Sequence, residues 1–483
     1  MHRLTLKFNF FYPIILLSLL VIAFYNIFYR LENFPISSWD EARHGVSAYE
    51  MLKRGNFIVS TYRNDIDYWN LKPPLSFWAN IAGYKLAGFN ALGLRLFSAL
   101  SAMLTIILVA IFVYKKHGRL ASLISTLTLT TCTQFLINHS ARTGDADSLF
   151  VFLFTASIMS LLLCEHNLKW LYGSGLGFAL AFLTKSWHAG NIAIIIGLYL
   201  LFTGTYKRLN HTNWILLLIC MVFPILAWGG IRYQYDGLEF FKNMFAYDLL
   251  QRSSTTIEGH LGGTLYYLEI LWRFFNYWLA ILYGLVLVYA NKDFSFKQFL
   301  SEKNSYKIGI CLWVIIPLLL FSLAKTKIRW YILPVYPPLS VIIGVLASKL
   351  LLIEKLGTKI TLLASILFVS FHYEGEIQAY LNKPTPKLQL NLIQKIHDIE
   401  KLKGYSLFLH LPSSPAKWAQ NMVLTSELYT DSQVEDGGMN EFLKKDKALL
   451  LLQKGKGTKQ LIKANQFIII ASNKWGYIVR KSK

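Results

Sequence analysis

The run YPIILLSLLVIAFYNIF, Tyr12–Phe28, is apolar along almost its whole length. A transmembrane helix needs roughly 20 predominantly apolar residues, or about 17 at the least. Comparable runs recur along the chain at Leu96–Tyr114, Trp214–Trp228 and Ile308–Leu323. Together these runs predict a polytopic α-helical membrane protein.

Composition supports this prediction. Of 483 residues, 54% are hydrophobic and 16% are charged, whereas a soluble chain of this length would carry many more charges. The formal net charge of +22 could also indicate a nucleic-acid binder, because basic patches neutralise phosphates. Most Lys and Arg residues stand in short loops between apolar runs, where they fix orientation in a membrane instead. We therefore expect no nucleic-acid partner.

The cysteines give no sign of a metal or disulfide framework. All four lie within or beside apolar runs and none forms a C-x-x-C pair. They are Cys132, Cys164, Cys220 and Cys311.

We expect about eleven transmembrane helices, with boundaries good to several residues. The predicted spans lie near residues 10–30, 93–114, 120–138, 147–164, 170–184, 189–204, 213–231, 265–290, 308–324, 330–348 and 359–373. The weakest are the two short spans on either side of Lys185. The first span follows a short basic segment and continues through aromatic residues to Tyr29, so we expect an uncleaved helix rather than a signal peptide.

Loop charges predict the orientation, because cytoplasmic loops carry an excess of Lys and Arg. One alternate set of loops holds most of these residues: Lys115, Lys116, Arg119, Lys169, Lys207, Arg208, Lys292, Lys297, Lys303, Lys307, Lys349, Lys355 and Lys359. With that set in the cytoplasm, the amino terminus is cytoplasmic and the carboxyl terminus extracytoplasmic.

The opposite set of loops contains three long segments, residues 31–92, 232–264 and the tail from about 374. The first is rich in aromatic residues and proline. We expect it to contain interfacial helices lying on the membrane, among them Asp40–Arg54, whose apolar residues recur near helical spacing.

The tail reads as a separate domain. It combines a helix-like stretch, Leu388–Leu402, with short β-like runs, which are Ser406–His410, Ala448–Leu452, Phe467–Ala471 and Tyr477–Arg480. About a hundred residues suffice for an independent fold. We therefore divide the chain into a transmembrane domain, residues 1–375, and an extracytoplasmic α/β domain, residues 376–483.

Polar residues of unusual kinds gather in the external segments. Residues 39–43 read Trp-Asp-Glu-Ala-Arg, and two carboxylates with an arginine at a membrane surface suit a general base and an anion clamp. The same residues suit a helix cap, since acidic groups are favoured in a first turn. Residues 70–74 read Asn-Leu-Lys-Pro-Pro, where Lys72 is either a functional cation or a snorkelling lysine before a helix.

A third motif lies between two predicted spans. Residues 138–147 include Arg142, Asp145 and Asp147, where only a short turn is needed. A salt bridge or helix cap would explain them, but carboxylates at a membrane edge are costly enough to indicate function.

Four cations in external turns break the positive-inside pattern: Lys185, Lys325, Lys327 and Arg329. Cations at membrane depth usually face a cavity and a partner, and a lipid-linked phosphate would be such a partner. The alternative is a topology shifted by one span. The external segment 232–264 adds Arg252 and the run Glu258-Gly259-His260.

These motifs together resemble a known family. They are Asp40-Glu-Ala-Arg43, Lys72-Pro-Pro74, Ala141-Arg-Thr-Gly-Asp-Ala-Asp-Ser-Leu-Phe150, and Ala324-Lys-Thr-Lys327 followed by Tyr331-Ile-Leu-Pro334. The family is that of the membrane glycosyltransferases with the C-type fold. The resemblance is strongest to the aminoarabinose transferases that modify lipid A and weaker to the protein O-mannosyltransferases, and it covers about residues 10–345.

The resemblance implies a donor sugar carried on a polyprenyl phosphate such as undecaprenyl phosphate, and transfer with inversion at the anomeric carbon. The implied acceptor is extracytoplasmic: a lipid such as lipid A, a glycan or a protein. The implied location is a bacterial inner membrane. No cofactor is required by the resemblance, although a divalent metal ion is compatible with it.

The resemblance also implies residue roles. Asp40 corresponds to the catalytic carboxylate, with Glu41 supporting it or binding a metal together with His260. Asp147, and after it Asp145, resemble a carboxylate at the mouth of the third and fourth spans. The implied ligands of the donor phosphate are Arg43, Lys72, Arg252, Lys185, Lys327 and Tyr331. A lone histidine such as His260 is otherwise most often a hydrogen-bonding surface residue.

Two positions depart from the family pattern. Leu71 stands where aminoarabinose transferases commonly have Glu, and Ser186 stands where many relatives have Gly. Both fall in the expected pocket, so they leave the donor sugar and any metal open.

Two other classes of function remain to be weighed. A transporter or flippase for a lipid-linked sugar would show repeated halves and charged residues at the bilayer midplane, whereas this sequence has no evident repeat and its polar motifs favour one face. A scaffold that binds a partner through its tail would leave the polar loop motifs unexplained.

Overall fold

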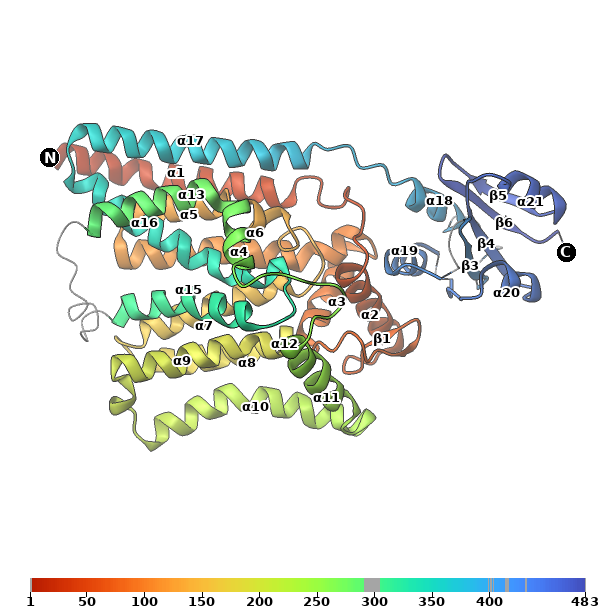
Figure 1. Ribbon diagram of the computed structural model, residues 1–483, viewed down its shortest axis with the longest axis horizontal. Coiled ribbons are helices and arrows are strands. Elements are labelled where there is room, and N and C mark those ends of the chain that lie inside the picture. Colours follow the sequence, from red (N-terminus) through yellow and green to blue (C-terminus); the bar gives the residue numbers. More distant parts are fainter. Residues whose placement is uncertain are drawn as a thin grey trace.

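The computed structural model describes residues 2–290, 305–397, 399, 402, 404–412, 417–430 and 432–482. In this part of the chain, long helices lie side by side as one bundle, and a small α/β domain stands at the end of the bundle opposite the amino terminus (Figure 1). The loop cations Lys292, Lys297 and Lys303, which contributed to the predicted orientation, lie outside the described residues.

Every predicted span coincides with helical structure. The elements are α1 (His2–Phe28), α4 (Ala91–His117), α5 (Arg119–Thr130) with α6 (Thr133–Ile137), α7 (Asp147–Leu163), α8 (Lys169–Lys185), α9 (Gly190–Thr203), α10 (His211–Asp236), α13 (Tyr266–Ala290), α15 (Ser305–Leu323), η5 (Arg329–Val335) with α16 (Tyr336–Ile353), and α17 (Leu356–Leu381). Within the described residues, 8 helical stretches are long and apolar enough to cross a membrane when residues 169–203 are counted as one. A multi-span membrane protein is thus confirmed, and the count of eleven stays a prediction.

The chain reverses between α8 and α9, which is the point on which the predicted topology depended. Lys185, at the end of α8, pairs with Asp147 at the start of α7. Tyr199, in α9, lies at the other end of α7, because a Cβ at Gly309 of α15 would meet both Leu162 and the Tyr199 ring. Each of the two short helices therefore runs the length of α7, and a 3₁₀ turn, η1 (Ser186–Ala189), joins them.

Shorter elements cover the end of the bundle nearest the α/β domain: α2 (Asp40–Arg54), the hairpin β1 (Thr61–Tyr62) and β2 (Asp65–Ile66), α3 (Leu75–Ala87), α11 (Glu239–Asn243), the π-helical η3 (Met244–Gln251) and α12 (Arg252–Ser254). Helix α2 has acidic residues in its first turn, basic residues in its last, and Gly55 in the left-handed conformation as its C-cap. These features complement the helix dipole and end the helix.

The expectation that Asp40–Arg54 lies on the membrane surface is wrong. Most residues of α2 are buried, and its apolar side chains Ala42, Val46 and Tyr49 belong to one core with residues of the carboxyl-terminal domain. The amphipathic pattern indicated a helix with one covered face. Protein rather than lipid covers that face, because the tail folds back over it.

The carboxyl-terminal domain contains α18 (Leu388–His397), β3 (Ser406–His410), α19 (Gln420–Thr430), α20 (Gly438–Lys444), β4 (Ala448–Gln453), α21 (Thr458–Ala464), β5 (Ile468–Ser472) and β6 (Gly476–Arg480). Its sheet has the order β3-β4-β6-β5, with β3 and β4 parallel and the other pairs antiparallel. Successive side chains of a strand face opposite sides. Accordingly Leu449 and Leu451 face the core shared with α2, while Leu450 and Leu452 face a second core under α20 and α21.

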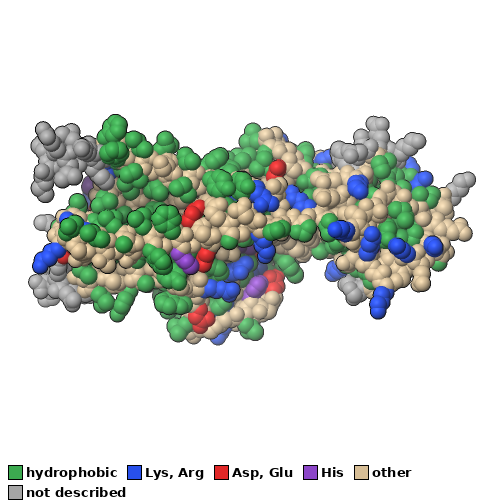
Figure 2. Space-filling model, turned by 90° about the horizontal axis from the view of Figure 1, so that it is seen from above, with side chains coloured by type: hydrophobic (Ala, Val, Ile, Leu, Met, Phe, Trp, Pro, Cys, Tyr) green, Lys and Arg blue, Asp and Glu red, His purple; other side chains and the backbone are tan. Residues whose placement is uncertain are grey.

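The expected domain boundary at residue 375 falls inside α17, which runs to Leu381. Tyr373, Ile377 and Leu381 are buried at helical spacing, so the same face of the helix continues to pack past residue 375. On the face shown in Figure 2, hydrophobic side chains are spread over the bundle, whereas Lys and Arg lie over the carboxyl-terminal domain and the adjoining end of the bundle.

Candidate active site

A cavity of about 460 Å³ opens where the polar motifs converge, at the end of the bundle nearest the carboxyl-terminal domain. Its lining is rich in ionisable and aromatic side chains. They include Trp39, Asp40, Trp69, Lys72, His139, Asp145, Asp147, Lys185, His188, Asp248, Arg252, Glu258, His260, Arg329, Trp330 and Tyr331.

Asp40 occupies the first position of α2 and faces two cationic groups. One carboxylate oxygen lies 3.8 Å from Lys72 Nζ, and the other lies 3.6 Å from His139 Nε2. Trp39, just before it, has a φ of 67°, a conformation that a bulky residue rarely adopts. Burial acts to raise the pKa of Asp40, but Lys72 and then His139 outweigh it and hold that pKa below its ordinary value. Asp40 is therefore an ionised carboxylate, partly exposed to the cavity.

Lys72 owes its position to the two prolines that follow it. Pro73 and Pro74 lead into α3, with Pro74 as its N-cap residue, so the backbone before them is extended. Lys72 Nζ donates to Asn70 Oδ1 at 2.9 Å and remains at the cavity surface beside Asp40.

The loop before α7 contributes a second charged group of residues. His139 Nδ1 lies 3.0 Å from Asp145 and 3.6 Å from Asp147, and Asp147 also pairs with Lys185. The His139 ring stacks on Trp330 with centroids 3.7 Å apart. Burial acts against protonation, but Asp145 and then Asp147 raise the pKa of His139 to about 9. His139 is thus held in its protonated form among three carboxyl groups, and burial raises the pKa of one of them, Asp145.

Arg252 forms the other wall of the cavity. It follows the π-helical segment η3, a rare geometry that is frequent at functional sites. Its guanidinium donates to Asp248 at 3.1 Å and to the Tyr331 hydroxyl at 3.3 Å. Lys185 Nζ lies 5.2 Å from the centre of the Tyr331 ring. Three predicted phosphate ligands, Arg252, Lys185 and Tyr331, are thus brought together.

Glu41 does not reach the cavity, although it neighbours Asp40 in sequence. It is buried, and its two oxygens accept from Arg95 Nε at 2.6 Å and Arg95 Nη2 at 3.0 Å. They also accept from the backbone N–H groups of Ser37 at 2.7 Å and Gly144 at 3.0 Å. Successive helical residues point in directions about 100° apart, so Asp40 and Glu41 face different surroundings. Glu41 joins the Asp40 loop to the Asp145 loop.

Two predicted phosphate ligands are also engaged elsewhere. Arg43 forms a bidentate pair with Asp67, at 2.9 and 2.8 Å, between the rings of Tyr62 and Trp69. Lys327 Nζ donates to the carbonyl oxygens of Phe321, at 3.0 Å, and Ser322 at the end of α15. The described lining of the cavity includes neither cation, and it includes Arg329 in place of Lys327.

The expected metal ligands His260 and Glu41 are not brought together, because His260 lines the cavity and Glu41 is bound to Arg95. The ligand atoms that do converge belong to His139, Asp145 and Asp147, within 4.8 Å of one another. In this arrangement Lys185 pairs with Asp147, and His139 Nδ1 lies 3.0 Å from Asp145. These three side chains and Lys185 thus satisfy one another's charges, and the same three are the ones that could hold a divalent ion.

Sequence reasoning did not select His139, Asp248 or Trp330 as site residues. His139 stands eight residues before Asp147, within the motif of residues 138–147. Its place in that motif was the one sequence feature that could have indicated a site residue. Asp248 and Trp330 join the site only through the fold of η3 and η5. The two departures from the family pattern, Leu71 and Ser186, both line the cavity as expected.

Comparison with known proteins adds independent information. A family model described as dolichyl-phosphate-mannose-protein mannosyltransferase matches residues 71–228. An uncharacterized protein of Aquifex aeolicus is 29% identical over 327 residues, which are 67% of this chain and 71% of that protein. The undecaprenyl phosphate-alpha-4-amino-4-deoxy-L-arabinose arabinosyl transferase 1 of Pseudomonas fluorescens is 27% identical over 340 residues, 68% of this chain and 59% of the transferase.

The chain is a relative of the aminoarabinose transferases. Its fold is that of ArnT from Cupriavidus metallidurans, solved with undecaprenyl phosphate, which matches with a TM-score of 0.73 at 16% identity over 97% of both chains. An archaeal oligosaccharyltransferase from Archaeoglobus fulgidus, solved with an inhibitory peptide and a dolichol-phosphate, matches with a TM-score of 0.55 at 11% identity, over 92% of this chain and 69% of that one. The C-type fold and the resemblance seen in the sequence are confirmed. The chain covers less than two thirds of the length of the arabinosyl transferase.

Proposed function

We propose that this protein is a glycosyltransferase that moves a sugar from a polyprenyl phosphate to an extracytoplasmic acceptor, with inversion. The observation that carries the proposal is the pairing of an ionised Asp40 with Lys72 in a cavity whose other wall holds Arg252 and Tyr331. A base beside a set of cations is what transfer from a phosphate leaving group requires.

In the proposed reaction an acceptor hydroxyl attacks the anomeric carbon on the face opposite the phosphate. Asp40 takes the hydroxyl proton as the new glycosidic bond forms. The bond from the anomeric carbon to the phosphate oxygen breaks, and the phosphate leaves with the electron pair. Lys72, Arg252 and Lys185 stabilise the charge that develops on it. Asp147 and Asp145 keep Lys185 and His139 in position rather than acting as bases.

The relatives' names support this donor chemistry, because they combine undecaprenyl phosphate with an arabinosyl transfer. We propose the same class of carrier here, a bacterial inner membrane as the location, a cytoplasmic amino terminus and an extracytoplasmic carboxyl-terminal domain. A transporter is less consistent with the polar side chains, which gather at one end of the bundle instead of its middle.

The test is glycosyl transfer by the purified protein from an undecaprenyl-phosphate-linked sugar. Asp40→Asn should lose transfer by at least about 100-fold, the range of a general base, while the thermal unfolding midpoint stays unchanged. Asp65→Asn makes the same chemical change at an exposed position of β2 and should keep full activity. Normal transfer by Asp40→Asn would remove Asp40 from the reaction, and flipping of the lipid-linked sugar across vesicles without transfer would favour the transporter.

A further inference from the structure

Helix α19 of the carboxyl-terminal domain lies along α2, the helix that begins with Asp40. Gln420, Leu424 and Glu427 are spaced i, i+4 and i+7, so they share one face of α19. Figure 1 shows α19 on the side of the domain that faces the bundle, next to α2 and α3. The two helices also share one hydrophobic core.

Three contacts join this face to α2 from one end to the other. Ser38 Oγ, two residues before Asp40, donates to Gln420 Oε1 at 2.7 Å. In the middle, a Cβ added at Gly45 would lie 2.5 Å from Leu424 Cδ2, so the absence of a side chain permits the close approach. Near the far end, the buried carboxyl groups of Glu427 and Glu50 lie next to each other.

The contact between Glu50 and Glu427 requires a proton. Both carboxyl groups are buried. Glu50 already accepts from Thr61 Oγ1 at 2.5 Å and from the Asn64 backbone N–H at 3.0 and 3.1 Å, so Glu50 acts as the acceptor and Glu427 supplies the proton. Burial, followed by the charge of Glu50, raises the pKa of Glu427 well above its usual value.

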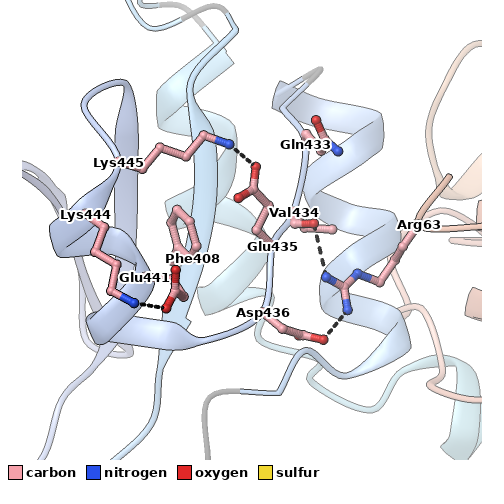
Figure 3. Close-up of a pocket in the computed structure, with 9 residues that line it drawn as sticks. All are labelled: Arg63, Phe408, Gln433, Val434, Glu435, Asp436, Glu441, Lys444 and Lys445. Carbon is pink, nitrogen blue, oxygen red and sulfur yellow. Dashed lines mark hydrogen bonds and ion pairs between the residues drawn. The ribbon is translucent and has the colours of Figure 1, made fainter.

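The charged and titratable groups around this pair do not supply a free counter-charge for a second carboxylate. They are Arg54 from α2, Tyr62 and Arg63 from the hairpin, and Tyr84 from α3. Arg63 is the cation that acts on Glu427, but it is paired with Asp436 at 2.5 Å and donates to the Val434 carbonyl oxygen, as Figure 3 shows. Arg54 donates to the Asn64 carbonyl oxygen.

We propose that α19 is a proton-locked clamp: the proton shared by Glu427 and Glu50 keeps the carboxyl-terminal domain seated on α2 and so holds Asp40 in position. The positioning role rests on the proposed function of Asp40, whereas the clamp itself does not. Glu427, Leu424 and Gln420 are positioning residues, since they act through α2 and the strained Trp39 rather than on substrate.

The pH dependence follows from where the proton is bound. A group whose pKa is raised in the docked state favours docking at low pH, and this contribution is lost as the pH rises through the raised pKa. Above that pH both groups are ionised. Docking would then bury two neighbouring carboxylates, of which only Glu50 has hydrogen-bond donors. The clamp should therefore open on the alkaline side, exposing α2.

Hydrogen exchange of the full-length protein in detergent, without substrate, measures the clamp directly. The amides of residues 40–54 are followed at a neutral and at an alkaline pH, with rates corrected for intrinsic exchange. In the native chain their protection should fall about tenfold or more at the higher pH, the size expected when a buried polar group loses its partner. Glu427→Gln should keep its protection, because the amide donates to Glu50 at every pH.

A second variant breaks the clamp independently of the proton. Leu424→Glu should lose protection of α2 about tenfold or more at both pH values, while Leu443→Glu, the same change at an exposed position of α20, should behave as the native chain. Equal pH responses in the native chain and Glu427→Gln would overturn the shared proton, and full protection in Leu424→Glu would overturn the clamp.

Transfer assays then test whether the clamp positions Asp40. If the protein transfers sugar, the alkaline loss of kcat in the native chain should disappear in Glu427→Gln; an unchanged alkaline limb would overturn the positioning role. If no sugar is transferred by any variant, the proposed function fails, while the exchange result still decides the clamp.

Discussion

Replacement of Glu41 by glutamine separates a structural role from a catalytic one. The Glu41–Arg95 pair is buried, with side chains that are 0% and 2% exposed. Oε1 accepts from Arg95 Nε and the Gly144 N–H, and Oε2 accepts from Arg95 Nη2 and the Ser37 N–H. Glutamine has the same shape, so Glu41→Gln opens no cavity and changes only charge and hydrogen bonding.

The magnitude follows from those four acceptor contacts. In either orientation, the glutamine NH₂ group faces two donors, which leaves two buried donors without an acceptor, at about 1–3 kcal/mol each. The charge of Arg95 also loses its partner, and breaking a buried ion pair costs about 3–5 kcal/mol. These two figures describe the same loss, so we expect a destabilisation of about 3–5 kcal/mol. The loops that carry Asp40 and Asp145 should loosen together.

Thermal unfolding in detergent, followed by tryptophan fluorescence, measures this loss, and initial transfer rates well below the midpoint measure chemistry. Glu41→Gln should unfold at a clearly lower temperature, whereas Glu32→Gln, at an exposed position, should match the native protein.

The stabilisation by Glu41 should also depend on pH. Burial opposes ionisation, but Arg95 lowers the pKa of Glu41. The stabilisation is therefore present above the ordinary carboxyl pKa and is lost as the pH falls through the lowered pKa of Glu41. A native midpoint combined with a loss of kcat beyond about 100-fold would refute this reasoning and assign Glu41 to the chemistry.

Four variants of the cations have further expected outcomes. Lys72→Gln should shift the acid limb of the pH–rate profile to higher pH, because Lys72 is the largest influence that lowers the pKa of Asp40; an unmoved limb would contradict this. Arg252→Gln should raise the donor KM about tenfold or more, since charge-assisted contacts to a phosphate are lost, whereas Arg43→Gln should leave KM within about twofold and lower stability, because its charge is used by Asp67. Lys327→Met should likewise lower the unfolding temperature with little change in KM, because the Lys327 ammonium donates to carbonyl groups at the end of α15. A large rise in KM in Arg43→Gln or Lys327→Met would show that the replaced cation binds the phosphate.

Exposed cations elsewhere in the chain supply controls for the cation variants. Lys85→Gln removes a lysine from the exposed face of α3 and should leave the pH–rate profile unchanged. Arg273→Gln removes an exposed arginine from α13 and should leave the unfolding temperature unchanged.

The sequence by itself determined the membrane class, the helical elements and most of the site. Apolar run length depends only on composition along the chain, so each predicted span coincided with a helix. The pattern of Asp40–Arg54 predicted that helix, and short β-like runs predicted the four strands of the carboxyl-terminal domain. Four residues that the sequence singled out line one cavity: Asp40, Lys72, Asp147 and Arg252.

Only the tertiary structure decided how each charge is used. Asp40 and Glu41 are adjacent and chemically alike, yet the helix turns one toward Lys72 and the other toward Arg95, which lies 54 residues away. Arg43 and Lys327 bind partners that no local sequence pattern specifies. Helix α19, rather than lipid, covers α2. The reason is physical: a sequence pattern specifies which face of an element is apolar, whereas the partner of a buried charge depends on which distant segments the fold brings within hydrogen-bonding distance.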